Sequence, residues 1–276
     1  MDQIFPLPEK QSSATKRRTR SDKGQLQLTQ RDRDVLRQIG EQTAYCFDQV
    51  QGLLARHPDS LSTDPECLSE TRTRATIRRW QQLGVADYRK ILYNEPGWVW
   101  LTKKGLQYTQ VQGRFLEPSP ANLEHLYWIN ETRGLIEHTY RAYTGFCWES
   151  ERQIRMIRER LQARQKEDEY TFIPFEYRGR HRPDALIRYL VDGKESTQEI
   201  VCAIEVELSE KSYEAWKKIF LELSQYYTHA YYYTDSSIKG SLTKALERFQ
   251  NEDLAYDKPK TERRKHIFIH ALEEFL

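Results

Sequence analysis

The sequence predicts a mixed α/β protein, α+β overall, with two folded units joined by a short linker. Hydrophobic residues make up 38% of the 276-residue chain and charged residues 30%, so the chain can bury a core. Helical periodicity dominates the first part of the chain, whereas strand patterns alternate with helices in the second. A polar stretch with two prolines, residues 113–121, separates these patterns and is the predicted linker.

Composition also narrows the class of protein. No apolar run approaches the ~20 residues that a bilayer span needs, so we expect no membrane association. The N-terminus lacks an apolar stretch of signal-peptide length, and the four cysteines lie far apart without a CxxC pair. Both observations favour a cytoplasmic location and argue against a disulfide scaffold or a structural zinc site. The net charge is only +2, so any argument for nucleic acid depends on where the charges lie.

Residues 1–24 form a basic arm that we expect to be disordered, because it has few large apolar side chains. The arm is either a solvated tail or a segment that attracts phosphate by charge.

Residues 25–112 predict three helices followed by a two-stranded ribbon. Thr29 is the expected N-cap of a helix over residues 31–39 that Gly40 ends, and a second helix is expected over Ala44–Arg56. The third helix begins near Leu68–Glu70 and ends at Gly84. Its expected apolar positions are Ala75, Ile77, Trp80 and Leu83. The extended segments Val85–Tyr93 and Trp98–Leu101 flank a Pro-Gly turn, and the string LTKKGL begins another short helix.

This order of elements resembles a winged helix-turn-helix domain, in which the third helix enters the major groove of DNA. Residues 70–90 carry six basic and two acidic side chains, and we expect Arg72, Thr73, Thr76 and Arg79 to share a solvent face. The predicted contacts to double-stranded DNA are Arg72, Arg74, Thr76, Arg78 and Arg79 on the helix, with Arg89 and Lys90 on the wing. The alternative is a winged helix that uses this charged face to contact protein.

Residues 122–276 predict a second unit with a mixed sheet. The expected helices are Asn122–Ala142, Ser150–Asp168, Ser212–Tyr226 and Ser237–Phe249, and the expected strands are Phe146–Glu149, His181–Leu190, Ile200–Leu208, Ala230–Tyr233 and His266–Ala271. A hairpin turn at Asp192-Gly193 joins the second and third of these strands.

Three acidic residues lie on the two strands that this hairpin joins. Glu205 and Glu207 point to the same face of their strand, because side chains alternate along it. Pairing of the two strands brings Asp184 beside them. Three carboxylates this close repel one another unless a cation or a basic side chain neutralises them, and Mg²⁺ is the usual metal for such a set.

The acids and the order of elements resemble the PD-(D/E)xK nuclease-like superfamily. The resemblance implies that Asp184 and Glu205 hold a metal ion, and Glu149 or Glu151, near the first strand, is the candidate for a further ligand. Glu207 stands where the superfamily has a lysine, so either Glu207 acts as a base or Lys211 reaches in from the next helix. The alternative is a metal-free scaffold in which arginines such as Arg182 neutralise the acids.

Four motifs in order narrow the resemblance. His125 and Asn130 in LEHLYWINETRGLIEH, Trp148 and Glu151 in WESERQIR, then HRPDAL and AIEVELSEKS follow the winged-helix region. Together they resemble the replication-relaxation family of plasmid and mobile-element proteins. The resemblance implies a DNA-binding protein that acts in replication, maintenance or mobilisation of such an element, beside a relaxase or replication protein. The alternatives are an active Mg²⁺-dependent endonuclease or nickase, and a transcriptional regulator with an inactive docking domain. The sequence does not predict the oligomeric state.

Two further features of the sequence are candidates for contact with nucleic acid. The tyrosines of residues 226–233 could stack on bases but are more typical of a core. A second basic patch lies within residues 258–265.

Overall fold

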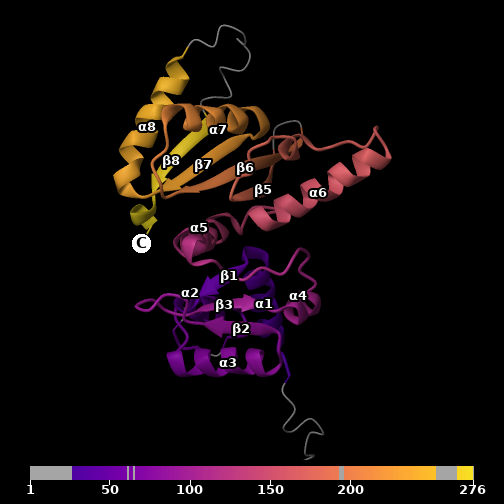
Figure 1. Cartoon of the computed structure of the whole chain (residues 1–276), viewed down its shortest axis with the longest axis vertical. Helices are drawn as coiled ribbons and strands as arrows, with labels where there is room; N and C mark the ends of the chain where they lie inside the picture. Colours follow the sequence, from indigo (N-terminus) through magenta and orange to yellow (C-terminus); the bar gives the residue numbers. More distant parts are fainter. Residues whose placement is uncertain (1–26, 61, 65, 193–195, 253–265, 276) are drawn as a thin grey trace, which may run out of the picture.

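The structure is a computed structural model that describes residues 27–275 except 61, 65, 193–195 and 253–265. The described part is mixed α/β, with one three-stranded and one five-stranded sheet. The three-stranded sheet and its helices occupy one end of the molecule, the five-stranded sheet occupies the other, and helix α5 lies between them (Figure 1). The basic arm of residues 1–24 and the patch of residues 258–265 lie outside the described residues.

The N-terminal half, residues 27–112, contains four helices and three strands in its described part. These elements are α1 (Gln30–Gln42), β1 (Ala44–Cys46), α2 (Phe47–Arg56), α3 (Glu70–Gln82), β2 (Ala86–Arg89), β3 (Trp98–Leu101) and α4 (Lys103–Thr109). The sheet order is β1-β3-β2, and both pairings are antiparallel. Leu36, Ile39 and Trp80 are fully buried in the core that the helices form against this sheet.

Local sequence signals predict the start of α1 correctly but not its end. The Thr29 side chain accepts from the Asp32 backbone N–H, and the Asp32 carboxylate accepts from the Thr29 backbone N–H, so the predicted N-cap is confirmed as part of a capping box. Gly40, expected to end this helix, lies inside it instead. A Cβ atom there would come within 2.6 Å of Leu101, so the glycine allows close packing of α1 on β3.

The prediction of one continuous helix over Ala44–Arg56 is wrong at its start. Residues 44–46 form β1 and pair with β3, and all three are buried. Sheet pairing and burial therefore override the helical pattern here. The expected strand Val85–Tyr93 is also shorter, because pairing with β3 covers only Ala86–Arg89.

The C-terminal half confirms the predicted alternation of strands and helices. Its longer elements are α5 (Leu123–Tyr140), β4 (Cys147–Ser150), α6 (Glu151–Glu167), β5 (Ala185–Asp192), β6 (Thr197–Glu207), α7 (Tyr213–Tyr226), β7 (His229–Thr234), α8 (Ser236–Asn251) and β8 (Ile267–Ala271). Short 3-10 turns are η1 (Pro120–Asn122), η2 (Phe175–Tyr177) and η5 (Leu272–Phe275). The sheet order is β4-β5-β6-β7-β8, antiparallel from β4 to β6 and parallel from β6 to β8.

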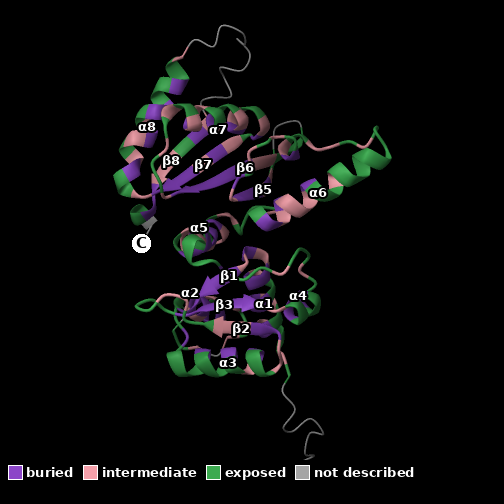
Figure 2. Ribbon diagram, in the orientation of Figure 1, coloured by how far each residue is buried: buried purple, intermediate pink, exposed green. Residues whose placement is uncertain are grey.

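Different helices cover the two faces of the five-stranded sheet. Helices α7 and α8 cover one face and α5 covers the other (Figure 1). Figure 2 shows buried residues along the strands of both sheets and exposed residues along α3 and the outer part of α6. None of the helices in the described ranges is long and apolar enough to cross a membrane.

Helix α5 joins the two halves through polar contacts. Asn130 of α5 donates to the Ala44 carbonyl at 3.0 Å, and Gln49 donates to the Tyr127 carbonyl at 2.9 Å. The buried Arg133 guanidinium forms an ion pair with Glu41 at 3.0 Å. Residues 113–121, the predicted linker, have almost no regular structure, and within them Arg114 offers its carbonyl oxygen to Arg152 at 2.7 Å.

Candidate nucleic-acid interface and acidic site

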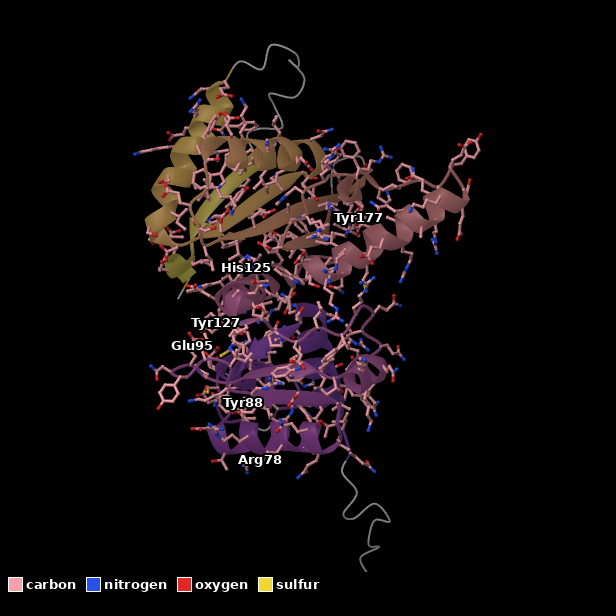
Figure 3. The ribbon with its side chains drawn as sticks, viewed as in Figure 1. Arg78, Tyr88, Glu95, His125, Tyr127 and Tyr177 are labelled. Carbon is pink, nitrogen blue, oxygen red and sulfur yellow. The ribbon has the colours of Figure 1, made fainter. Side chains whose placement is uncertain are left out.

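Helix α3 presents one face to solvent at the free end of the N-terminal half. Residues Thr71, Arg74, Ala75, Arg78 and Gln82 are exposed and recur at helical spacing, and Arg72 and Gln81 beside them are exposed too. Arg78 lies on the side of α3 that points away from the sheet (Figure 3). This exposed face is approximately 20 Å long for a 13-residue helix.

The predicted orientation of α3 is wrong by part of a turn. Thr73 and Thr76, expected on the solvent face, are buried at 0% and 6% exposure, whereas Ala75, expected in the core, is exposed. The buried stripe runs through positions 73, 76, 77 and 80, which is the i, i+3, i+4, i+7 pattern. Thr73 fits the interior because its hydroxyl donates to the Ser69 carbonyl at 3.1 Å. Thr76 is therefore removed from the expected DNA-contact face.

Arg79 turns toward the core of the N-terminal half. Its guanidinium lies 2.6 Å from the carboxylate of Asp32, which is fully buried. The indole N–H of Trp80 donates to the same carboxylate at 3.0 Å. This ion pair links α3 to α1, so the Arg79 charge is not available to a ligand.

The other arginines of α3 that were predicted to contact DNA differ in whether their side chains already have a partner in the fold. Arg74 forms an ion pair with Glu70 at 2.7 Å and stacks on the Phe47 ring at 4.9 Å. Arg72 and Arg78 are exposed and make no ion pair or hydrogen bond with any residue that the structure describes. These two arginines are the available charges of the helix.

The wing predicted from sequence lies near residues 89–94, and the structure places these residues at the end of β2 and in the loop that leads to β3. Arg89 lies 5.3 Å above the Trp100 ring and 3.7 Å from Glu117. Lys90 donates to the Tyr93 carbonyl at 3.3 Å, and the Tyr93 side chain is 91% exposed. Glu95 marks this loop in Figure 3.

The acidic residues of the second half gather at one end of β5 and β6. The predicted antiparallel pairing is confirmed, with Ala185 opposite Ile204. The expected strand start at His181 is wrong, because β5 begins at Ala185 and residues 181–184 form the loop before it. Asp184 Oδ2 accepts from the Val206 backbone N–H at 2.7 Å, which fixes this carboxylate at the sheet end.

Asp184 and Glu205 each have a histidine partner. His125 Nε2 on α5 lies 3.0 Å from the Val206 carbonyl oxygen and 3.3 Å from Asp184 Oδ2. Burial alone would lower the pKa of His125, but the hydrogen bond and charge of Asp184 raise it to about 9. His181 Nε2 lies 2.7 Å from Glu205 Oε1, and the same balance of burial against a carboxylate raises the pKa of His181.

Glu205 is nearly buried, and its environment favours the neutral form. Burial raises the pKa of Glu205 to about 7 against the opposing effect of His181, and the charges of Asp184 and Glu207 add to the rise. Glu207 forms an ion pair with Lys211 and accepts from the Ser209 backbone N–H at 3.2 Å. The expectation that Lys211 reaches this position from the start of the next helix agrees with that contact.

The arrangement does not fit a metal centre as it stands. Asp184, Glu205 and Glu207 each already have a basic partner, and the expected ligand Glu151 is 48% exposed and 3.7 Å from Arg182. Among the described residues, no group of three or more His, Cys, Asp and Glu side chains is placed to hold a metal. The structure thus gives the acids internal neutralising partners, and the Mg²⁺ site stays a prediction.

Sequence reasoning missed the role of His181. This residue lies in the HRPDAL motif, but its partner Glu205 is 24 positions away, so strand periodicity gives no signal for the pair. The network of Glu149 was also missed, in which Tyr177 donates at 2.6 Å and Arg188 at 2.8 Å (Figure 3 labels Tyr177). The available hint was a charged residue on each of two predicted neighbouring strands, Glu149 on β4 and Arg188 on β5.

No protein-family model, curated protein or solved structure matches this chain. The resemblance to the replication-relaxation family therefore rests on the sequence motifs and stays a prediction.

Proposed function

We propose that this chain is a double-stranded DNA-binding protein that acts in the replication, maintenance or mobilisation of a plasmid or other mobile element. The observation that carries the proposal is the exposed face of α3, where Arg72 and Arg78 have no internal partner in the described structure. Unpaired arginines on an outward helix supply the phosphate and guanine contacts that duplex binding requires.

The arrangement around α3 supports a winged-helix interpretation. The element order α1-β1-α2-α3-β2-β3 and the sheet order β1-β3-β2 support the proposal, in which α3 is the third helix and residues 89–94 are the wing. The third helix of this class lies in the major groove, which is about 12 Å wide.

The exposed face of α3 has side chains suited to base edges. Thr71 and Ala75 are small, so the helix can approach closely, and an alanine methyl can contact the thymine methyl. Arg78 can reach guanine and Gln82 adenine, each with two hydrogen bonds. Lys90 and Tyr93 of the wing would lie against the neighbouring backbone.

Salt-dependent binding tests the proposal. A labelled 30-base-pair duplex of mixed sequence is titrated with the full chain at several salt concentrations, and anisotropy gives the affinity. The Arg72→Ala, Arg78→Ala double variant is expected to bind more weakly, with a salt slope reduced by roughly 1, because Arg72 is assigned to a phosphate and Arg78 to a guanine edge.

The matched control removes the same charge elsewhere. Arg164 and Lys166 lie exposed near the end of α6, and the Arg164→Ala, Lys166→Ala variant is expected to retain duplex binding. Equal loss in both variants would show that overall charge, and not α3, determines binding.

A Mg²⁺-dependent endonuclease is the second candidate, and the Glu207–Lys211 contact favours it. The Lys211 ammonium forms an ion pair with Glu207, which stands at the position where the nuclease-like superfamily has a lysine. Supercoiled plasmid incubated with Mg²⁺ or Mn²⁺ tests this candidate. Nicking by the natural chain but not by an Asp184→Ala, Glu205→Ala variant supports cleavage, and equal behaviour of the two proteins rejects it. A C-terminal half without cleavage activity would instead dock a relaxase or replication protein.

A further inference from the structure

Residues 170–182 connect α6 to β5 and combine exposed aromatic side chains with arginines. The segment reads YTFIPFEYRGRHR, in which aromatic residues come first and arginines follow. The chain turns back at the far end of α6 and returns to the five-stranded sheet through this segment (Figure 1).

Three aromatic side chains of this segment are exposed, and contacts hold two of them, Phe172 and Phe175, in place. Tyr170 is 87% exposed, Phe172 72% and Phe175 42%. The Arg178 guanidinium lies 5.3 Å from the Phe172 ring centroid and 5.6 Å from that of Phe175, and its Nε donates to the Ile173 carbonyl at 2.7 Å. Phe175 also packs on Tyr226 at 5.1 Å. Clustered exposed aromatics of this kind mark a binding surface.

The arginines that follow carry charge available to a ligand. Arg178, Arg180 and Arg182 are exposed. Within the described residues, Arg178 and Arg180 form no ion pair, and Arg182 has only the 3.7 Å contact with Glu151.

Two acidic side chains that pack on this part of the chain, Glu176 and Glu222, already have other partners. Glu176 forms an ion pair with Arg188 at 2.8 Å, and Glu222 accepts from the His181 backbone N–H at 2.8 Å. Glu167, Asp168 and Glu169 precede Tyr170 at the opposite end of the segment. The positive charge therefore increases from Phe172 toward Arg182.

We infer that residues 170–182 bind single-stranded DNA. Bases stack on the open surfaces of Phe172 and Phe175, and Arg178 and Arg180 contact the phosphates. Single strands fit this segment and duplexes do not, because the faces of paired bases are covered by their neighbours. The choice of DNA over RNA rests on the proposed function, whereas the choice of an unpaired strand rests on the segment itself.

The segment leads to the acidic site. His181 lies between Arg180 and Arg182, and its ring contacts Glu205 at 2.7 Å. A strand that follows the arginines thus ends beside Glu205 and Asp184. The site gives the C-terminal half a nucleic-acid ligand of its own, separate from the duplex on α3.

Anisotropy of a labelled 15-nucleotide oligo(dT) tests the inference. The Phe172→Ala, Phe175→Ala variant is expected to raise Kd at least about fivefold, since each base–aromatic contact contributes to affinity. Phe172→Trp should retain binding, whereas Phe172→Leu should raise Kd, because leucine keeps an apolar surface but has no π face on which a base can stack. Circular dichroism verifies that the exposed substitutions leave the fold intact.

Further variants separate this inference from the proposed function. The Arg72→Ala, Arg78→Ala variant is expected to keep oligo(dT) binding while it loses duplex binding, and Arg164→Ala, Lys166→Ala should keep both. Duplex binding without oligo(dT) binding would overturn this inference alone. Full binding by Phe172→Leu would indicate an apolar docking surface for protein and overturn it, and tighter binding of oligo(rU) than of oligo(dT) would overturn the assignment to DNA.

Discussion

The exposed face of α3 and the acidic end of the five-stranded sheet use charge in opposite ways. At the sheet end, His125, His181 and Lys211 each contact one of three carboxylates, so the charges are matched within the chain. On α3, Arg72 and Arg78 stand in solvent without a partner among the described residues. Side chains that already have a partner within the fold are occupied, whereas unpaired exposed charges are available to a ligand.

Two adjacent residues of α3 show the same contrast within one turn of helix. Arg79 forms an ion pair with the fully buried Asp32, and Arg78 points into solvent. The number of arginines on a helix therefore says less about DNA binding than the number that the fold leaves unpaired.

The largest effect on stability is expected when the ion pair between Arg79 and Asp32 is broken. Arg79→Ala removes the partner of a buried carboxylate and is expected to lower the free energy of unfolding by about 3–5 kcal/mol. Chemical denaturation measures the loss. Arg78→Ala is the control and should change stability by less than ~0.5 kcal/mol. Similar losses in the two variants would contradict the comparison.

An intermediate effect concerns pH and the Glu205 carboxyl. Its pKa in the folded chain is about 7, above its ordinary value, so its stabilising contribution is present below pH ~4.5 and is lost as the pH rises through about 7. Glu205→Gln cannot ionise, so its stability relative to the natural chain should improve by about 2–3 kcal/mol over this range. Urea denaturation from pH 4.5 to 8, with a chelator present, measures the difference. A difference that does not change with pH would show that Glu205 titrates normally.

The smallest expected effect is the coupling between Glu207 and Lys211. The lysine side chain is 35% exposed, so solvent weakens the pair, and a double-mutant cycle to alanine should give about 1 kcal/mol. The unfolding free energies of the four proteins supply the coupling. A coupling near zero would mean that groups other than Lys211 neutralise Glu207.

Much of the candidate site followed from strand geometry. Alternation placed Glu205 and Glu207 on one face, and the predicted antiparallel hairpin brought Asp184 to the same sheet end. The histidines that neutralise these acids did not follow, because His125 lies on α5 and His181 in a loop. Their pairing depends on how α5 and the loop pack on the sheet.

The sequence by itself determined the order of helices and strands apart from β1, and the local boundary at Thr29, because capping and periodicity involve residues within a few positions of one another. Only the tertiary structure decided that residues 44–46 form a strand and that α3 buries Thr73 and Thr76. It also decided which arginine of α3 turns inward, since Asp32 lies 47 residues from Arg79. Contacts of that separation form only when the whole core assembles, and no local pattern records them.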